Sequence, residues 1–186
     1  MTGVDSFGER LLEVALLEGE FTLRSGKTSR WYLDKYRFET EPELLRELGI
    51  RLAASAAELE PEATRLAGPA LGAVALAAST SMASGLPFII VRDEPKGYGT
   101  GNRIEGTFEP GELVCLVEDV VTSGGALGAA VAAVRTAGLV VRHAVCVVDR
   151  EDGGTDMLAR LGVRLTSLYR AAELLATREE GVTPHG

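Results

Sequence analysis

Residues 113–127 bring together several groups that can bind an anion. An apolar run ends in two adjacent acids, Glu118 and Asp119, and a turn of small residues then opens a helical stretch. The turn consists of Val120, Val121, Thr122, Ser123, Gly124 and Gly125. Successive backbone N–H groups in such a turn form an anion pocket, and the two hydroxyls add donors for a terminal phosphate. The acids would repel a phosphate unless ribose hydroxyls, or a Mg²⁺ ion with other ligands, lay between them.

A simpler interpretation of this segment is a helix cap. Thr122 or Ser123 would then only satisfy backbone N–H groups, while the two acids lie in solvent. The segment also lacks the G-x-x-x-x-G-K-[ST] pattern of a P-loop and the G-x-G-x-x-G pattern of a dinucleotide site. Because an apolar strand, an acid pair and two glycines occur together, we favour a binding loop.

Two further segments place basic residues in Gly-rich surroundings. Residues 92–106 are too polar and Gly-rich to form a helix or a strand through most of their length, which predicts a long mobile loop carrying Arg92 and Lys96. Arg150 follows an apolar run and enters a Gly-rich turn, where its guanidinium suits a planar carboxylate. The alternatives are a solvated surface loop and a surface Arg150 paired with Asp152.

The elements that must position these residues alternate along the chain. β-rich runs occur at residues 65–67, 88–91, 113–117, 140–148 and 164–168, and Ala-rich helical stretches occur at 71–84, 125–137 and 155–161. This alternation implies crossover connections and a parallel sheet. The runs at residues 113–117 and 144–148 are apolar on both faces, as in central strands covered by helices. The prediction is an α/β fold with a doubly wound, mostly parallel sheet flanked by helices, which binds ligands beyond the carboxyl ends of its strands.

The N-terminal segment predicts a small appendage to this body. Apolar spacing indicates a helix over residues 5–18 ending at Gly19, and residues 20–23 and 30–34 then alternate like the strands of a hairpin. A second helix is expected over residues 42–58. We therefore expect one domain over residues 1–186, with a hood contributed mainly by residues 1–40. The polar residues 178–186 predict a disordered tail.

Composition excludes several classes of function. The formal charge of −8 opposes binding to nucleic acid, which depends on basic surface. Neither a transmembrane span nor an export signal is evident, so we expect a cytoplasmic protein without a membrane partner. Cys115 and Cys146 lie in apolar runs, and no paired Cys or His spacing indicates zinc.

Residues 113–125 resemble the phosphoribosyl pyrophosphate signature of the type I phosphoribosyltransferases: an apolar strand, two acids, two apolar residues and T-S/T/A-G-G/T. The resemblance implies that Glu118 and Asp119 hold the ribose 2′ and 3′ hydroxyls, with Asp119 important for catalysis. It implies that residues 121–125 hold the 5′-phosphate. Glu118 stands where Asp is common in orotate enzymes.

Three further segments are similar to the orotate phosphoribosyltransferase family. Residues 21–34 match its F-x-L-x-S-G-x-x-S segment and the aromatic strand that follows, which cover the base. This similarity assigns Arg24, a position usually occupied by Lys, and Tyr32 to orotate, together with Thr122. The third segment is residues 147–154, in which Arg150 matches the arginine that binds the orotate carboxylate.

The second segment, residues 92–106, resembles the family's catalytic loop, R-K-x-x-K-x-H-G followed by I-E-G. The match assigns Arg92, Lys96 and Tyr98 to the pyrophosphate, so the implied catalytic residues are Asp119, Lys96 and Arg92. Asp93 replaces a basic residue and Tyr98 replaces a histidine, which removes a charge and an imidazole from this loop. The stretch 70–72 lacks the basic residue found there in some orotate enzymes.

The resemblance implies transfer of the phosphoribosyl group from phosphoribosyl pyrophosphate to orotate, with Mg²⁺ carried mainly by the substrate and no metal ligand assigned to a side chain. It also implies a homodimer in which the 92–106 loop acts in the neighbouring site. The alternatives are transfer to a purine and a non-catalytic regulator that senses phosphoribosyl pyrophosphate. Arg150 argues against the first, and retention of Glu118, Asp119 and Lys96 argues against the second.

Overall fold

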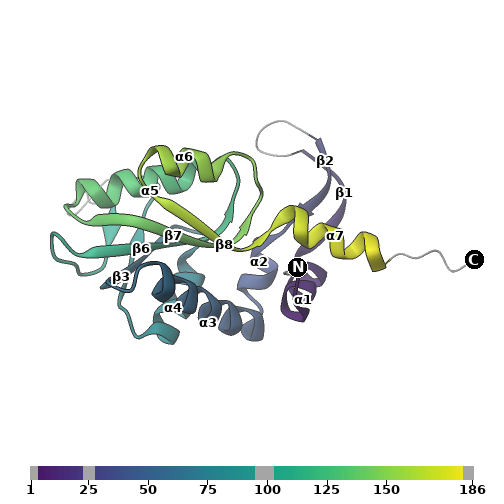
Figure 1. Cartoon of the computed structure of the whole chain (residues 1–186), viewed down its shortest axis with the longest axis horizontal. Helices are drawn as coiled ribbons and strands as arrows, with labels where there is room; N and C mark the ends of the chain where they lie inside the picture. Colours follow the sequence, from purple (N-terminus) through teal and green to yellow (C-terminus); the bar gives the residue numbers. More distant parts are fainter. Residues whose placement is uncertain (1–3, 23–27, 95–102, 182–186) are drawn as a thin grey trace, which may run out of the picture.

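A computed structural model describes residues 4–22, 28–94 and 103–181, with side chains through Thr177 (Figure 1). Three of the residues assigned to the site, Arg24, Lys96 and Tyr98, lie outside the described residues. Among the described helices, none combines the length and the apolar character needed to cross a bilayer.

The body is built on one six-stranded sheet in the order β5-β4-β3-β6-β7-β8. All its neighbouring pairs are parallel except β4 with β5. The strands are β3 (Arg65–Pro69), β4 (Phe88–Val91), β5 (Ile104–Glu105), β6 (Leu113–Val121), β7 (Val140–Asp149) and β8 (Arg164–Arg170). Strands β6 and β7 are buried along most of their length, as the apolar runs predicted.

Helices cover both faces of this sheet. Figure 1 shows α3 (Pro42–Leu59) and α4 (Val74–Ser84) on one face, and α5 (Gly125–Thr136) and α6 (Gly154–Arg160) on the other. Two hydrophobic clusters fill the spaces between these layers, one on each side of the sheet. The predicted α/β fold with a doubly wound, mostly parallel sheet is confirmed.

The N-terminal elements and the last helix lie together at one end of the body (Figure 1). They are α1 (Ser6–Ala15), β1 (Leu16–Thr22), β2 (Thr28–Leu33), α2 (Lys35–Glu39) and α7 (Ala171–Gly181). The predicted hairpin is present, but α1 ends at Ala15 and not at Gly19. The reason is strand pairing: Leu16 already pairs with Leu33 in the antiparallel ladder of β1 and β2. Helices α2 and α7 and the short strand β5 were not predicted.

Strand β6 is longer than its apolar run. It was expected to end at Val117, yet it continues to Val121 and pairs with β7 as far as Val121 opposite Asp149. Glu118 and Asp119 therefore belong to the strand itself and not to the loop after it. Pairing with the partner strand overrides the change from apolar to acidic residues.

The two central strands part before β6 ends. The ladder between β3 and β6 stops at Ala67 opposite Leu116, whereas β3 continues beside β4 to Pro69 opposite Val91. From β3 the chain turns outward to β4, and from β6 it turns the other way to β7. A parallel sheet opens a crevice at such a switch point. The last five residues of β6, from Val117 on, have no partner strand on its β3 side.

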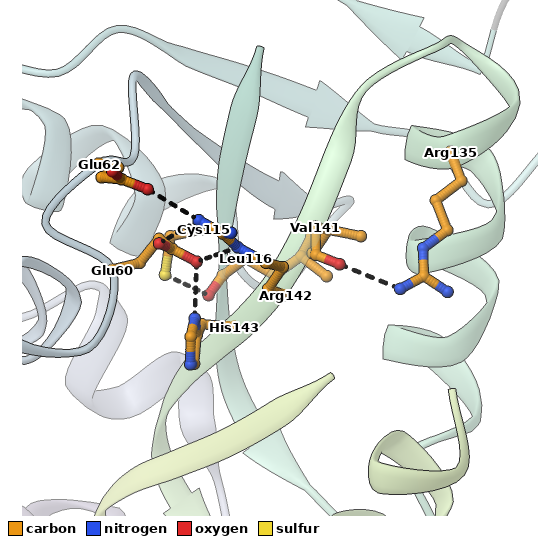
Figure 2. A network of polar contacts seen from close by, with 8 residues as sticks. All are labelled: Glu60, Glu62, Cys115, Leu116, Arg135, Val141, Arg142 and His143. Atoms are coloured by element: carbon orange, nitrogen blue, oxygen red, sulfur yellow. Dashed lines mark hydrogen bonds and ion pairs between the residues drawn. The ribbon is translucent and has the colours of Figure 1, made fainter. Parts of the chain in front are cut away.

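A buried carboxylate lies at the opposite, amino-terminal end of the strands. Glu60, the C-cap of α3, accepts hydrogen bonds from Arg142 at 2.8 and 3.0 Å and lies 2.7 Å from Nδ1 of His143 (Figure 2). Burial alone would raise the pKa of Glu60, but the hydrogen bonds from Arg142 and His143 outweigh it and lower the pKa. This network joins α3 to the start of β7 and so fixes the helix on the sheet.

Replacing Glu60 with glutamine should lower the free energy of unfolding by about 1–3 kcal/mol, since it removes the buried charged partner of Arg142 and His143. Because the folded pKa of Glu60 is depressed, its contribution is present above the ordinary carboxyl pKa and is lost as the pH falls through the folded value. Urea unfolding of Glu60→Gln near neutrality and near pH ~3 measures both effects.

The exposed neighbour Glu62, which contacts the same arginine at 3.2 Å, supplies the control variant Glu62→Gln. Its expected loss is below about 0.5 kcal/mol. Equal losses in the two variants would contradict a stabilising role for the buried carboxylate.

Candidate functional site

The crevice between β3 and β6 holds an ion pair. Asp119, near the end of β6, is only 3% exposed, and its Oδ2 lies 2.5 Å from Nζ of Lys35 at the start of α2. Its other oxygen, Oδ1, accepts a hydrogen bond from the backbone N–H of Val120. A buried carboxylate needs such partners because an unpaired charge is costly away from water. Asp119 thus joins the central strand to the hood.

The loop after β3 closes against this ion pair. A Cβ atom on Gly72 would clash with both Asp119 Oδ2 and Lys35 Nζ, so the backbone approaches the pair where no side chain fits. The peptide bond between Ala70 and Leu71 in the same loop is cis. Glycine at position 72 therefore leaves room for the ammonium group beside the acid.

Two more acids surround Asp119. Glu118 and Glu39 are both buried, and Glu118 accepts a hydrogen bond from the backbone N–H of Asp119 at 3.1 Å. Burial, followed by the negative charge of Asp119, raises the pKa of Glu118 well above its usual range. Burial and the same negative charge raise the pKa of Glu39 to about 8. Near neutrality both side chains therefore favour the protonated form, and Lys35 compensates Asp119.

The pKa of Lys35 responds to the same surroundings. Burial opposes its charged form, but the charge of Asp119 and the hydrogen bond to it outweigh burial and raise the pKa. Lys35 therefore remains an ammonium ion at neutral pH.

The turn after β6 presents free backbone donors at the start of α5. Gly124, the N-cap of α5, has a left-handed φ of 80°, and no side chain caps this helix end. A Cβ on Gly124 would also lie 2.6 Å from Met157 Cε, so packing against α6 and backbone conformation both require glycine. Thr122 and Ser123 are exposed. This arrangement fits the predicted anion pocket.

Arg150 is placed by a second turn, at the end of β7. Its backbone N–H donates to the carbonyl of Val121 at 2.8 Å, which fastens this turn to the anion pocket. Asp149 accepts hydrogen bonds from the N–H of Glu151 and the hydroxyl of Thr155. The guanidinium carbon of Arg150 lies 4.5 Å from the ring centroid of Trp31 in β2. The pairing of Arg150 with Asp152, which was the alternative interpretation, is loose, at 3.8 Å.

Two site residues predicted from the sequence have other partners in this ligand-free structure. The Tyr32 ring packs against Phe21, with ring centroids 5.6 Å apart. Successive residues of a strand point to opposite faces. Trp31, and not Tyr32, therefore lies beside Arg150. Arg92 follows β4 and lies 3.8 Å from Glu105. The structure thus brings together Glu118, Asp119, the 120–125 turn and Arg150.

Sequence reasoning missed Lys35, Glu39 and Trp31. Lys35 and Glu39 lie on opposite ends of a five-residue helix that is too short to give a periodic pattern. One signal was present: the chain has three lysines, and Lys35 is the one outside the predicted loops. In so acidic a protein each lysine is a candidate for holding an anion.

Within the described parts of the chain, no three His, Cys, Asp or Glu side chains are grouped to hold a metal ion. Asp119 and Glu118 nevertheless offer carboxylate oxygens, the donors that Mg²⁺ prefers, at the crevice. These residues fit an ion that arrives with most of its ligands already supplied by a substrate.

The raised pKa of Glu39 predicts a pH-dependent stability. The folded pKa of Glu39 lies above its unfolded value. The stability that protonated Glu39 contributes is therefore fully present below the unfolded pKa of 4.5 and is lost as the pH rises through about 8. The ligand-free protein should therefore melt at a lower temperature at pH ~9 than at pH ~6. The variant Glu39→Gln, which does not ionise, should show a smaller decrease.

Differential scanning calorimetry at both pH values measures this difference. The exposed Glu58 of α3 supplies the control variant Glu58→Gln, which should behave like the unaltered protein. An equal decrease in the Glu39 variant would show that another group controls the titration.

The chain is similar to known proteins over most of its length. No protein-family model matches the chain. It is 51% identical over 159 residues to an orotate phosphoribosyltransferase of Methanocella arvoryzae, covering 84% of this chain and 88% of that protein.

Two solved structures are also similar. The orotate phosphoribosyltransferase of Aeropyrum pernix superposes with a TM-score of 0.82 at 30% identity, covering 93% of this chain and 98% of that one. An enzyme of the same name from Mycobacterium tuberculosis, in complex with 5-phospho-α-D-ribosyl 1-diphosphate, superposes with a TM-score of 0.73 at 28% identity, covering 90% and 96%. With this identity over most of its length, the chain belongs to the orotate phosphoribosyltransferase family.

Proposed function

We propose that this protein transfers the 5-phosphoribosyl group from phosphoribosyl pyrophosphate to orotate, giving orotidine 5′-monophosphate and pyrophosphate in the pathway to UMP. The observation that carries this proposal is the convergence of Asp119, the uncapped start of α5 and Arg150 at one switch point of the sheet. One crevice therefore offers an acid for the ribose, backbone donors for a phosphate and a cation for a carboxylate.

The sugar phosphate occupies the β6 side of this crevice in our proposal. Asp119 and Glu118 accept hydrogen bonds from the ribose 2′ and 3′ hydroxyls. The backbone N–H groups of residues 121–125 and the exposed hydroxyls of Thr122 and Ser123 bind the 5′-phosphate. Entry of the ribose separates the acids from the phosphate, which removes the repulsion between them.

The base lies toward the hood. The guanidinium of Arg150 binds the orotate carboxylate, while the adjacent Trp31 ring fixes the orientation of the guanidinium plane. Within the described residues its buried Nε makes no hydrogen bond and lies 3.8 Å from Asp152. A neutral purine would leave this guanidinium without a counter-charge. The same proposal gives Thr122, Tyr32 and Arg24 contacts with the base.

The transfer breaks one bond and forms another at the anomeric carbon. The bond from this carbon to the diphosphate oxygen breaks, and its electron pair leaves with the pyrophosphate. The N1 atom of orotate forms the new bond and gives up its proton. Positive charge develops on the ribose ring, where Asp119 stabilises it, and negative charge develops on the diphosphate, where Arg92, Lys96 and Tyr98 bind.

Mg²⁺ is the cofactor in this proposal. Asp119 and Glu118 would supply the protein oxygens that hold the ion, together with the diphosphate of the substrate. When bound, Mg²⁺ neutralises charge on the leaving group.

The proposal also includes a cytoplasmic homodimer. Cys115 and Cys146 are free and buried, as suits a reducing compartment. In the dimer, the 92–106 loop of one subunit acts in the site of its partner. Arg92 and Glu105, at the two ends of this loop, are held close by the pairing of β4 with β5.

Arg150 predicts the base specificity. Orotate absorbance should fall with protein, Mg²⁺ and phosphoribosyl pyrophosphate, whereas adenine, hypoxanthine, xanthine and uracil should not react. Arg150→Gln should raise KM for orotate about 10- to 100-fold, because a charge-assisted hydrogen-bond pair is lost. Arg160→Gln, which removes an exposed charge on α6, is the control. Turnover of another base, or an unchanged KM in the Arg150 variant, would overturn this assignment.

The shared loop predicts complementation between two inactive variants. Lys96→Ala and Asp119→Asn should each lose about 100- to 1000-fold in kcat. After unfolding and refolding together, a mixed dimer holds one site with both residues intact, and roughly a quarter of normal activity should return. Each variant refolded alone is the control. If the loop acted in its own subunit, the mixture would stay inactive.

A further inference from the structure

We propose that Lys35 is a substrate-binding residue that transfers its contact from Asp119 to the diphosphate of phosphoribosyl pyrophosphate when the sugar enters. This inference rests on the proposed function, because it concerns the leaving group of the same reaction. It adds to the site a cation that comes from the hood and not from the 92–106 loop.

The position of Lys35 follows from three elements that meet at one point. Its ammonium lies 2.5 Å from Asp119 on β6 and against Gly72 in the loop after β3. In phosphoribosyl pyrophosphate the diphosphate is attached to the ribose carbon next to the one that bears the 2′ hydroxyl. A cation touching the carboxylate that binds this hydroxyl is therefore within a few ångströms of the diphosphate oxygens.

The supports of Lys35 show that this position is built into the hood. Asp34 caps α2 through a hydrogen bond to the N–H of Tyr36, and its own N–H donates to the carbonyl of Ala15 at 2.8 Å. Phe38 in the same helix is fully buried. The short helix is therefore fixed at both ends, while the side chain of Lys35 remains 29% exposed.

Charge explains why a cation at this point must exchange partners. The crevice already contains the negative charge of Asp119, and the incoming diphosphate adds further negative charge. Elsewhere at the site, Arg150 is held over Trp31 and Arg92 lies near Glu105. Lysine has three donors on a flexible stem, so its ammonium can rotate from a carboxylate to a phosphate without moving the backbone.

A purely structural role for Lys35 would have a different consequence. If it only neutralised buried Asp119, its removal would lower stability and leave pyrophosphate affinity unchanged. If it binds the diphosphate, its removal must weaken ligands that carry a diphosphate and spare those that carry only the sugar phosphate.

The test measures binding of three probes by isothermal titration calorimetry: inorganic pyrophosphate with Mg²⁺, phosphoribosyl pyrophosphate with Mg²⁺, and ribose 5-phosphate. In Lys35→Met, which keeps the alkyl stem, the first two should bind about 10- to 100-fold more weakly. Ribose 5-phosphate should change by less than about threefold, since its contacts are with the acids and the 121–125 turn. KM should rise for phosphoribosyl pyrophosphate and change little for orotate.

Two controls keep this test decisive. Arg37→Ala removes a positive charge from the exposed face of the same helix, where it donates to the carbonyl of Val14, and should bind all three probes normally. Lys35→Arg should restore part of the pyrophosphate affinity. Unchanged pyrophosphate binding in folded Lys35→Met, or equal weakening of all three probes, would overturn the inference. An unaltered protein that binds phosphoribosyl pyrophosphate but does not consume orotate would instead overturn the proposed function.

Discussion

The buried negative charge of Asp119 constrains the structure around the crevice. A carboxylate that is 3% exposed needs a partner, and Lys35 supplies it from a helix 84 residues earlier in the chain. The parting of β3 and β6 gives this pair its space, and Gly72 keeps the space free of a side chain. Hood, central strand and loop are thus held to one another through a group that the substrate must be able to release.

This constraint explains how a chain with a net charge of −8 can bind a strongly anionic substrate. Burial keeps Glu39 and Glu118 largely protonated near neutrality, so the crevice carries less negative charge than its residues suggest. Backbone donors at the start of α5 add no formal charge. The few cations then act locally, each on one anionic group: Arg150 on the carboxylate of the base, and Lys35 with the 92–106 loop on the diphosphate.

The central strands and the sugar-phosphate site could be predicted from the sequence, because both depend on the local pattern of residues. The apolar runs located the central strands, and the acid pair followed by small residues located the sugar-phosphate site. The rest depends on partners distant in sequence. The extent of β6 is set by its pairing with β7, and the one-residue alternation of β2 decides that Trp31, and not Tyr32, meets Arg150. Lys35 and Glu39 lie on a single helical turn that no periodic pattern marks.

The most direct test of this account is a crystal structure of the protein with phosphoribosyl pyrophosphate and Mg²⁺. The account predicts that the ribose hydroxyls lie within hydrogen-bond distance of Asp119, that the 5′-phosphate lies on the 121–125 turn, and that the Lys35 ammonium has moved onto the diphosphate. A sugar bound elsewhere on the sheet, or one bound while Lys35 still holds Asp119 and the diphosphate lies away from it, would contradict it.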